Sequence, residues 1–205
     1  MRKMGLKSIL VCAAAVSVLL TAGCASQSVA RVSADTVMDL SGYWNDTDVR
    51  IVADSIVSDC VNAPAISNYI RTNNKMPVVI VGSFRNDSDE HLDTSILVKK
   101  FETALINSGK VDFVASSAER GDIRAEREEQ QEWASESTAK RLANETGADF
   151  MLIGSVKTIV DQADKTSTRT YWVYAELIDI ESNRKLWIGE NSEIKKVIKR
   201  SSVRM

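Results

Sequence analysis

Three apolar runs in the last third of the chain place the tightest constraint on its fold. They are "ADFMLIGSVKTIV" (148–160), "TYWVYAELIDI" (170–180) and "RKLWIGENSEI" (184–194). Each run has the composition of a strand, and a short polar turn separates it from the next, which is typical of an antiparallel meander. A sheet with one buried face needs other elements packed against that face.

Two earlier runs predict further strands. The run "MPVVIVGSF" (76–84) is continuously apolar and suits a central buried strand, with Pro77 near its start, where a missing N–H is tolerated. The run "KVDFVA" (110–115) predicts a shorter strand. Because helical patterns are interspersed with these runs, we expect an α/β fold: a small, mainly antiparallel sheet packed with helices, not a doubly wound parallel sheet.

Two amphipathic helices carry clear start and stop signals. Asn45 is the expected N-cap of a helix that runs to about Val61, and Trp44 precedes it at the position of a hydrophobic staple. A second helix is expected to begin after Asp93, its N-cap, and to end at Gly109. The staple favours Trp44 as the residue that closes the domain, whereas an exposed binding anchor is the alternative.

Further helical signals lie between the strand runs 110–115 and 148–160. Ser116 and Glu119 have the spacing of a capping box, which opens a highly charged stretch, 118–133, that we expect on the surface. The segment "SESTAKRLANETG" (135–147) then predicts a short helix that ends at Gly147.

The first 23 residues have the order of an export signal. A basic segment precedes an apolar run of about 13 residues, which is shorter than the roughly 20 that span a bilayer. The next residues resemble a bacterial lipobox: Leu20, Thr21, Ala22 and Gly23 before Cys24. Cleavage before Cys24 would leave this cysteine lipidated at the new N-terminus. An ordinary secretory signal with a chance cysteine is the alternative.

The small and polar residues 24–38 predict a short tether, and 39–205 is the predicted domain. The tether would reach about 50 Å when fully extended and roughly 20 Å as a flexible coil.

Charge and cysteine content narrow the function classes. The net charge of −2 falls to about −5 when the signal is removed, since 23 basic side chains then face 28 acidic ones. A mildly acidic protein lacks the electrostatic footprint of a nucleic-acid binder.

With Cys12 in the signal and Cys24 acylated, Cys60 remains alone, so we expect no disulfide and a buried thiol. One histidine and no Cys or His cluster argue against a structural zinc site.

A catalytic constellation can be assembled only within one short segment. Ser88, His91 and Asp93 supply triad residue types, and Glu90 with Asp93 supplies a pair of carboxylates. Such chemistry needs groups that converge in a cleft, whereas capping and turn formation explain these residues more simply. The glycines are scattered singles without a phosphate-binding loop, so we expect no cofactor and no enzyme activity.

The polar segment after the first strand run is the main candidate for a partner. It supplies five candidate partner-binding residues: Arg85, Asn86, Asp87, Glu90 and His91. Loops at strand ends often carry recognition residues, but an internal hydrogen-bonded turn is an equal reading of this segment. Two weaker candidates are the strand aromatics (Tyr171, Trp172, Tyr174 and Trp187) and the acid-free tail "IKKVIKRSSVRM" (194–205), which suits anionic headgroups, an acidic partner or a solvated end.

Three blocks of the chain resemble one family. "DLSGYWNDTDVRIVADSIV", "IVGSFRNDSDEHLDTSILVKKFETALINSGKVDFVASSAER" and "STAKRLANETGADFMLIGSV" are similar to successive blocks of the LpoB family, and the similarity covers Asp39 to Glu193. The resemblance implies a domain similar to the N-terminal domain of TolB. It also implies an outer-membrane lipoprotein that faces the periplasm and activates a bifunctional penicillin-binding protein.

The tether departs from this family pattern. The best-known family members have a long, proline-rich tether, whereas this chain has about 15 residues there. The alternative is an envelope assembly module similar to CsgG-like lipoproteins, which oligomerise. The activator reading favours a monomer.

Overall fold

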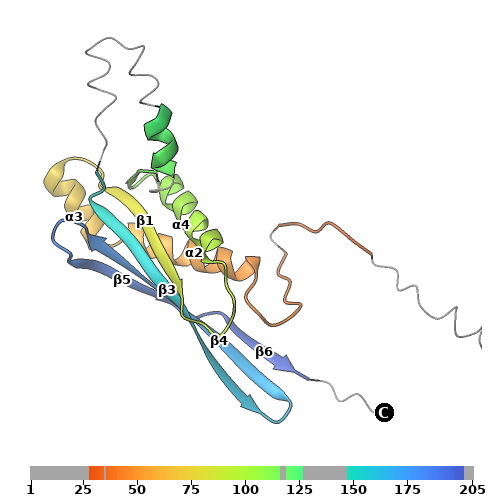
Figure 1. Cartoon of the computed structure of the whole chain (residues 1–205). Coiled ribbons are helices and arrows are strands. Elements are labelled where there is room, and N and C mark those ends of the chain that lie inside the picture. The colour runs from red at the N-terminus through yellow and green to blue at the C-terminus, as the bar shows by residue number, and fades with distance from the viewer. Residues whose placement is uncertain (1–27, 35, 116–118, 127–146, 201–205) are drawn as a thin grey trace, which may run out of the picture. The chain divides into compact units, whose positions relative to one another are not determined.

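The computed structural model describes residues 28–34, 36–115, 119–126 and 147–200. The chain divides into two units, Met1–Thr36 and Val37–Met205, and the helices and strands of the described residues lie in the second unit (Figure 1). The signal, the lipobox and the segment 135–146 of the predicted short helix lie outside the described residues, as does Ser116 of the expected capping box. Residues 119–126, which follow it, are helical.

The predicted helices form where their caps place them. Helix α2 (Asp46–Val61) begins after Asn45, whose side chain accepts a hydrogen bond from Asp48 N, while the Asp48 carboxylate accepts from Asn45 N. Helix α4 (Thr94–Ser108) begins after the N-cap Asp93 and ends at Gly109, which is in the left-handed conformation. Both predictions are confirmed, and the reciprocal capping of α2 satisfies two backbone N–H groups that the helix leaves unpaired.

One helix was not expected from the sequence. Helix α3 (Pro64–Asn73) has proline in its first turn and ends at Asn74, a non-glycine residue with φ of 51°. Its only buried residue is Ile66, so its apolar pattern is too thin to signal a helix. Tyr69 attaches it to the sheet through an edge-to-face contact with Phe150, with ring centroids 5.1 Å apart.

The sheet has six strands in the order β2-β1-β3-β4-β5, and β6 also pairs with β4. The strands are β1 (Val78–Asn86), β2 (Asp112–Phe113), β3 (Phe150–Ala163), β4 (Thr166–Asp179), β5 (Lys185–Asn191) and β6 (Lys195–Lys199). The first strand is parallel to β2 and β3, whereas every pairing of β4 is antiparallel. The predicted mainly antiparallel α/β fold and its meander are therefore confirmed.

The β3–β4 hairpin is longer than the sequence suggested, and the tail completes it. Every residue of β3 pairs with β4, from Phe150 opposite Asp179 to Ala163 opposite Thr166. On the other edge of β4, β5 pairs with the part near Asp179 and β6 with the part near Thr166. Lys195–Lys199 is thus a strand and not a frayed terminus, and it lies along the hairpin (Figure 1).

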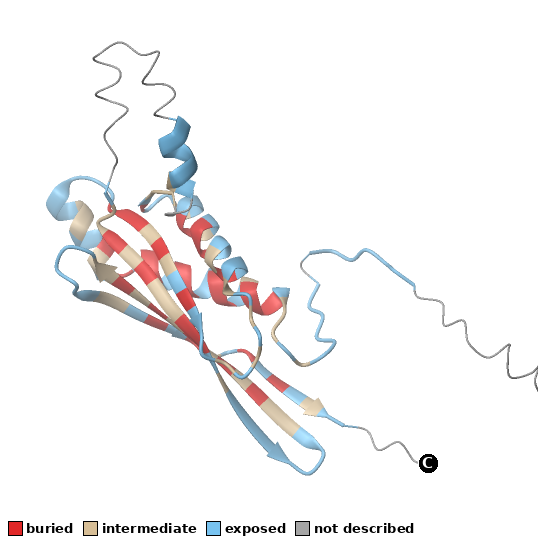
Figure 2. Ribbon diagram, in the orientation of Figure 1, coloured by how far each residue is buried: buried red, intermediate tan, exposed pale blue. Residues whose placement is uncertain are grey.

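Helices α2 and α4 cover one face of the sheet and leave the other open. Along β4 the residues at odd positions from 169 to 177 are buried, and those at even positions are only partly buried. The buried set packs with apolar residues of α2 and α4 to form the core. Figure 2 shows this burial where the helices lie on the sheet and exposure toward the hairpin end.

A close approach inside the core requires glycine at one position. A Cβ at Gly154 would lie 2.4 Å from the Phe84 ring and 2.2 Å from the carbonyl oxygen of Tyr174. The space that glycine leaves is filled by Phe84, which contacts Phe101 of α4 with ring centroids 4.6 Å apart. Cys60 is buried as expected, and burial raises the pKa of its thiol to about 12.

Candidate functional site

The five predicted partner-binding residues lie at the end of β1 (Arg85 and Asn86) and in the loop that follows it, and hydrogen bonds within this segment hold it in place. The Asn86 amide donates to the Glu90 carbonyl oxygen at 2.7 Å and accepts from the Ser88 hydroxyl at 2.5 Å. The Ser88 hydroxyl in turn accepts from Glu90 N at 3.2 Å. The predicted internal turn is therefore present, and it fixes the positions of the side chains that point outward.

Glu90 anchors this loop to the sheet through a buried ion pair. One carboxylate oxygen lies 2.5 Å from a guanidinium nitrogen of Arg169 and accepts a hydrogen bond from the Tyr171 hydroxyl. The other accepts from Trp44 N at 3.3 Å. The side chains of Glu90 and Arg169 are only 9% and 11% exposed, so this pair is shielded from water. Glu90 is thus engaged within the domain and positions the loop.

Asp89 extends the same network toward solvent. It contacts Arg169 at 2.7 Å and accepts a hydrogen bond from the Thr158 hydroxyl of β3. This hydroxyl, with the positive charge of Arg169, lowers the pKa of Asp89 below its ordinary value. With half of its side chain exposed, Asp89 joins the buried anchor to the outer surface of the loop.

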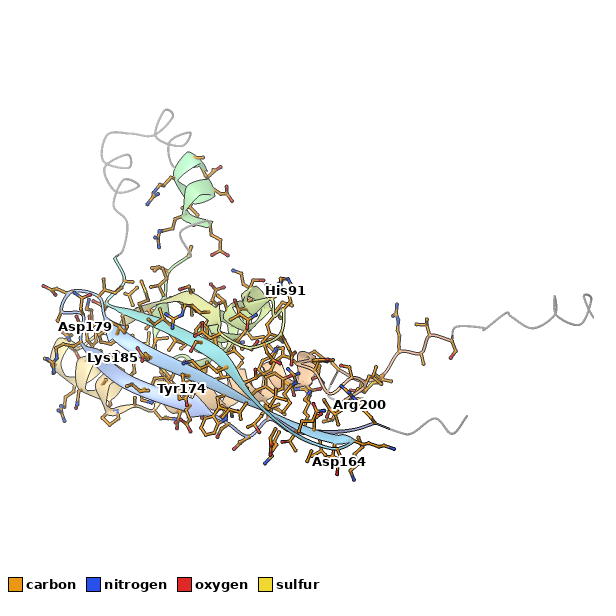
Figure 3. All side chains as sticks on the ribbon, turned by 60° about the horizontal axis from the view of Figure 1, so that its bottom comes forward. His91, Asp164, Tyr174, Asp179, Lys185 and Arg200 are labelled. Atoms are coloured by element: carbon orange, nitrogen blue, oxygen red, sulfur yellow. The ribbon has the colours of Figure 1, made fainter. Side chains whose placement is uncertain are left out.

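The remaining candidate residues face outward. Arg85 and Asp87 form an exposed ion pair at 3.6 Å, and Arg85 is 71% exposed. His91 is also exposed, and Figure 3 places it at the outer edge of the domain. The structure therefore divides the five candidates: Arg85, Asp87 and His91 are available to a partner, whereas Asn86 and Glu90 are used inside the loop.

The structure does not bring Ser88, His91 and Asp93 together as a catalytic triad. The Ser88 hydroxyl is engaged with Asn86 and Glu90, and Asp93 accepts a hydrogen bond from Ser95 N at 2.9 Å as the cap of α4. Hydrogen bonding from Ser95 lowers the pKa of Asp93, which keeps it an ionised cap. Within the described residues, no group of three or more His, Cys, Asp or Glu side chains is placed to hold a metal ion.

The segment before α2 packs against the same network. The ring of Trp44 lies 5.1 Å from that of Tyr171, and Trp44 is one of the partly buried residues packed on the core. Tyr43 is half exposed and lies over the Arg169 guanidinium, 4.9 Å from ring centroid to carbon. Trp44 therefore closes the domain, as the staple position indicated, while Tyr43 adds an exposed aromatic face beside the loop.

A second buried ion pair holds this segment to β6. Lys196 is 8% exposed and contacts Asp48 at 2.6 Å and Asp39 at 2.7 Å. It also donates to the carbonyl oxygen of Tyr43 at 2.8 Å. Hydrogen bonds from Lys196 and Asn45 lower the pKa of Asp39. No local pattern in the sequence indicates this contact, because Asp48 and Lys196 are 148 residues apart.

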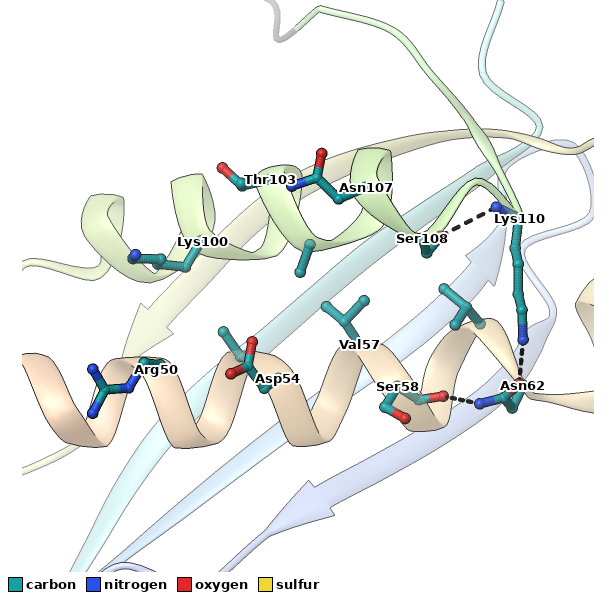
Figure 4. Close-up of a pocket in the computed structure, with 13 residues that line it drawn as sticks. Arg50, Asp54, Val57, Ser58, Asn62, Lys100, Thr103, Asn107, Ser108 and Lys110 are labelled. Atoms are coloured by element: carbon teal, nitrogen blue, oxygen red, sulfur yellow. Dashed lines mark hydrogen bonds between the residues drawn. The ribbon is translucent and has the colours of Figure 1, made fainter. Parts of the chain in front are cut away.

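A groove of about 620 Å³ between α2 and α4 is a further feature that the sequence did not indicate (Figure 4). Its lining includes the apolar residues Ala53, Val57, Val61 and Ala104. At one end Lys110 donates to the Asn62 side chain, which itself donates to the Ser58 carbonyl oxygen at 2.7 Å. The groove is open and mostly polar at its rim, so it accommodates an extended group better than an enclosed small molecule.

The strand aromatics divide between the two faces of the sheet. Tyr171 is fully buried, and Trp187, opposite the buried Leu177, packs on the core. Trp172 and Tyr174 lie on the open face, where their rings stack with centroids 6.3 Å apart.

Comparison with a model of a known family identifies the relationship. The model described as peptidoglycan-synthase activator LpoB matches residues 48–193, well over half of the chain. The chain belongs to the LpoB family. The predicted resemblance, which began at Asp39, is thus confirmed over residues 48–193, and the LpoB match begins in α2 and ends just before β6.

Solved LpoB structures are similar at low identity. The LpoB C-terminal domain from Escherichia coli is 18% identical, with 69% of this chain and 99% of that chain covered and a TM-score of 0.36. The NMR structure of E. coli LpoB is 16% identical, with 88% and 86% covered and a TM-score of 0.40. Lipoprotein GNA1162 from Neisseria meningitidis is also 16% identical, with 61% and 85% covered and a TM-score of 0.36. No curated protein matches the chain.

Proposed function

We propose that this protein is a lipid-anchored activator that binds a bifunctional peptidoglycan synthase, a penicillin-binding protein, and thereby regulates cell-wall synthesis. The observation that carries the proposal is the LpoB family match over residues 48–193, which includes α2, the loop with the candidate residues, and the meander. The protein acts as a binding module without chemistry of its own. Its expected state is a monomer.

The proposed anchor is Cys24, lipidated after cleavage behind Gly23. The support is the order of the first 24 residues: a basic segment, a short apolar run and a lipobox-like end. Among the described residues, no helix has the length and hydropathy to cross a bilayer. Family membership favours the outer membrane, with the domain facing the periplasm.

The proposed contact surface is the outer side of the loop after β1. Arg85, Asp87 and His91 are exposed there, and Tyr43 presents an aromatic face beside Asp89. Because Glu90 and Asn86 fix the loop from within, its exposed side chains lose little conformational freedom on binding. Arginine and tyrosine are also the residue types that most often dominate protein interfaces.

Co-purification of the lipidated full chain from a detergent extract of native membranes tests the function. A peptidoglycan synthase should be recovered with the chain. Recovery of other partners without any synthase would contradict the activator role, and a stable ring of the purified protein would favour the oligomeric envelope module. Cys24→Ala tests the anchor separately, because it should abolish acylation and membrane retention.

A pair of variants tests the contact surface. Arg85→Glu combined with His91→Ala should weaken synthase binding at least about tenfold, because hot-spot side chains are worth about 1–2 kcal/mol or more each. Lys110→Glu on the groove is the control and should bind normally. Equal binding by both variants, with unchanged thermal melting, would exclude the loop as the contact surface.

A further inference from the structure

One part of the open sheet face collects lysines and apolar side chains from three strands. The cross-strand register puts Lys157 opposite Trp172, and Ile159 and Lys195 opposite Thr170. It also puts Val197 opposite Thr168 and Lys199 opposite Thr166. Residues directly opposite on antiparallel strands share a face, and even positions of β4 face away from the helices. The register also puts Asp161 of β3 opposite Thr168. We call this set the hairpin face: Lys157, Ile159, Asp161, Trp172, Lys195, Val197 and Lys199.

The apolar members of the hairpin face are largely uncovered. Ile159 and Val197 are each 58% exposed, and Trp172 is partly exposed. Side chains of this kind, interspersed with lysines, are typical of surfaces that lie at a membrane interface, where aliphatic and indole groups enter the headgroup region.

Exposed basic side chains gather at this end of the domain. Its exposed cations are Lys157, Lys165, Lys195, Lys199 and Arg200. Two exposed carboxylates lie in the hairpin itself, Asp161 on β3 and Asp164 in the turn. Three further exposed carboxylates lie close by: Asp89, which pairs with Arg169, Asp39, which pairs with Lys196, and Glu193, two residues before Lys195. Figure 3 shows Asp164 and Arg200 at this end. None of the five cations has an ion pair among the described residues, so their charges face solvent.

The chain joins the domain along β6, through contacts with residues of β6 that face the helix layer, on the opposite side of the sheet from the hairpin face. Asp39 contacts Lys196 of β6 at 2.7 Å, and Gly42 lies so close to Ile198 that a Cβ would be 2.5 Å from its side chain. Gly42 also has φ of 75°, which favours glycine. Residues 39–42 thus run along β6, and the segment from Cys24 is attached at the hairpin end of the sheet.

The length of that segment favours a membrane as the occupant of the hairpin face. A flexible coil of about 15 residues, the length of the stretch from Cys24 to Asp39, would span roughly 20 Å. Asp39 contacts Lys196, which pairs with Arg169, and Asp179 lies ten residues further along β4, about 33 Å away. An anchor at Cys24 therefore keeps the hairpin face closer to the lipid surface than any part of the sheet near Asp179.

We propose that the hairpin face docks on anionic lipid headgroups of the membrane that holds the anchor. This proposal rests on the proposed lipid anchor at Cys24. The lysines supply electrostatic attraction, and Trp172, Ile159 and Val197 supply apolar contact. An acyl chain combined with a basic patch holds a protein on a membrane more stably than one chain alone.

A fluorescent label on the lipidated full chain in vesicles tests the docking. An environment-sensitive probe is attached at Val197→Cys and, as the control, at Ile106→Cys, which is 54% exposed on α4. Cys60 is buried with its pKa raised to about 12, so its thiol does not compete for the label. With phosphatidylglycerol in the vesicles, the probe at 197 should shift to the blue and be protected from an aqueous quencher. The control probe should not change, and high salt or pure phosphatidylcholine should reverse the effect.

A variant that lacks three of the lysines tests whether the docking is electrostatic. Replacing Lys157, Lys195 and Lys199 together by Gln should lower the docked-to-undocked ratio at least about tenfold, because each basic residue near an anionic surface contributes on the order of a fivefold preference. Unchanged melting confirms that the variant is folded. Equal protection of the probe at 197 in the variant and the parent chain would overturn the electrostatic docking.

Two further readouts separate the possible failures. The mass of the chain reports acylation at Cys24, so an unacylated chain overturns the proposed anchor and the docking with it. An acylated chain whose probe at 197 stays open to the quencher on both kinds of vesicle overturns the docking alone. If that probe becomes protected only when detergent-solubilised membrane proteins are added, an acidic protein partner replaces the lipid surface.

Discussion

Two neighbouring lysines, Lys195 and Lys196, show how differently the domain uses the same side chain. Lys196 points toward the helix layer, where it is 8% exposed and contacts two carboxylates. Lys195 points to the open face, is exposed, and has no ion pair among the described residues. Because successive residues of a strand face opposite sides, one step along β6 changes a structural lysine into a surface one.

Asp89 and Glu90 differ in the same way on the loop after β1. Glu90 is 9% exposed and holds Arg169, whereas half of the Asp89 side chain is exposed. The buried charges are paired and join segments distant in sequence, while the exposed ones remain available to partners. Breaking a buried pair should therefore affect folding, and changing an exposed charge should affect binding.

The largest effect on stability is expected from Lys196→Ala. This change leaves Asp48, 5% exposed, without its cation in the interior and should lower the free energy of unfolding by about 3–5 kcal/mol. Urea denaturation measures the effect. Lys195→Ala is the matched control and should change stability by no more than about 0.5 kcal/mol. Equal losses of stability in both variants would contradict the structural role of Lys196 and the surface role of Lys195.

Glu90→Gln should give the next largest effect. The amide keeps the size of the side chain but removes the charge opposite Arg169, which should cost about 2–3 kcal/mol in the free energy of unfolding. Asp87→Asn on the exposed side of the loop is the control, and its urea midpoint should stay close to that of the parent chain. A Glu90→Gln variant as stable as the parent would show that the pair does not anchor the loop.

Trp44→Ala should lower stability by about 2 kcal/mol, since it removes a partly buried ring packed on Tyr171. Tyr43→Ala, next to it, should cost no more than about 1 kcal/mol, the usual range of an exposed cation–π contact. Thermal melting of both variants measures the difference. Loss of partner binding by Trp44→Ala without a change in melting temperature would make Trp44 a binding anchor instead.

The smallest effect is a pH dependence at Asp89. Its pKa is lowered in the folded protein by the Thr158 hydroxyl and by Arg169, so ionised Asp89 contributes stability above its unfolded pKa of about 3.9. That contribution is lost as the pH falls through the folded pKa. Asp89→Asn should therefore be less stable than the parent at pH 7 by no more than about 1 kcal/mol, and the gap should close below about pH 4. A gap that is constant with pH would contradict the assignment.

Local signals in the sequence were sufficient for much of the fold. The caps at Asn45 and Asp93, the stop at Gly109 and the three strand runs each depend on a few neighbouring residues. By contrast, β6 was missed because its lysines conceal the strand alternation, and α3 because only Ile66 is buried in it. Both gain their stability from packing or pairing with distant parts of the chain.

The candidate site was predictable only in part. The sequence placed polar residues at the end of a strand, and the structure shows that Arg85 at the end of β1 and Asp87 and His91 in the following loop are exposed. It could not separate them from Glu90, because the partner of Glu90, Arg169, lies 79 residues away on β4. A buried arginine in a strand is hard to recognise from the sequence around it. Only its position shows it, because it stands at one of the alternate positions that apolar residues otherwise occupy.

The rate of glycan polymerisation by a purified bifunctional peptidoglycan synthase tests the central claim most directly. Addition of the lipidated full chain should raise that rate in a saturable manner, while Arg85→Glu with His91→Ala should require at least about tenfold more protein for the same effect. A rate that stays unchanged over the whole titration, with a chain that is folded and acylated, would contradict the proposed activator function.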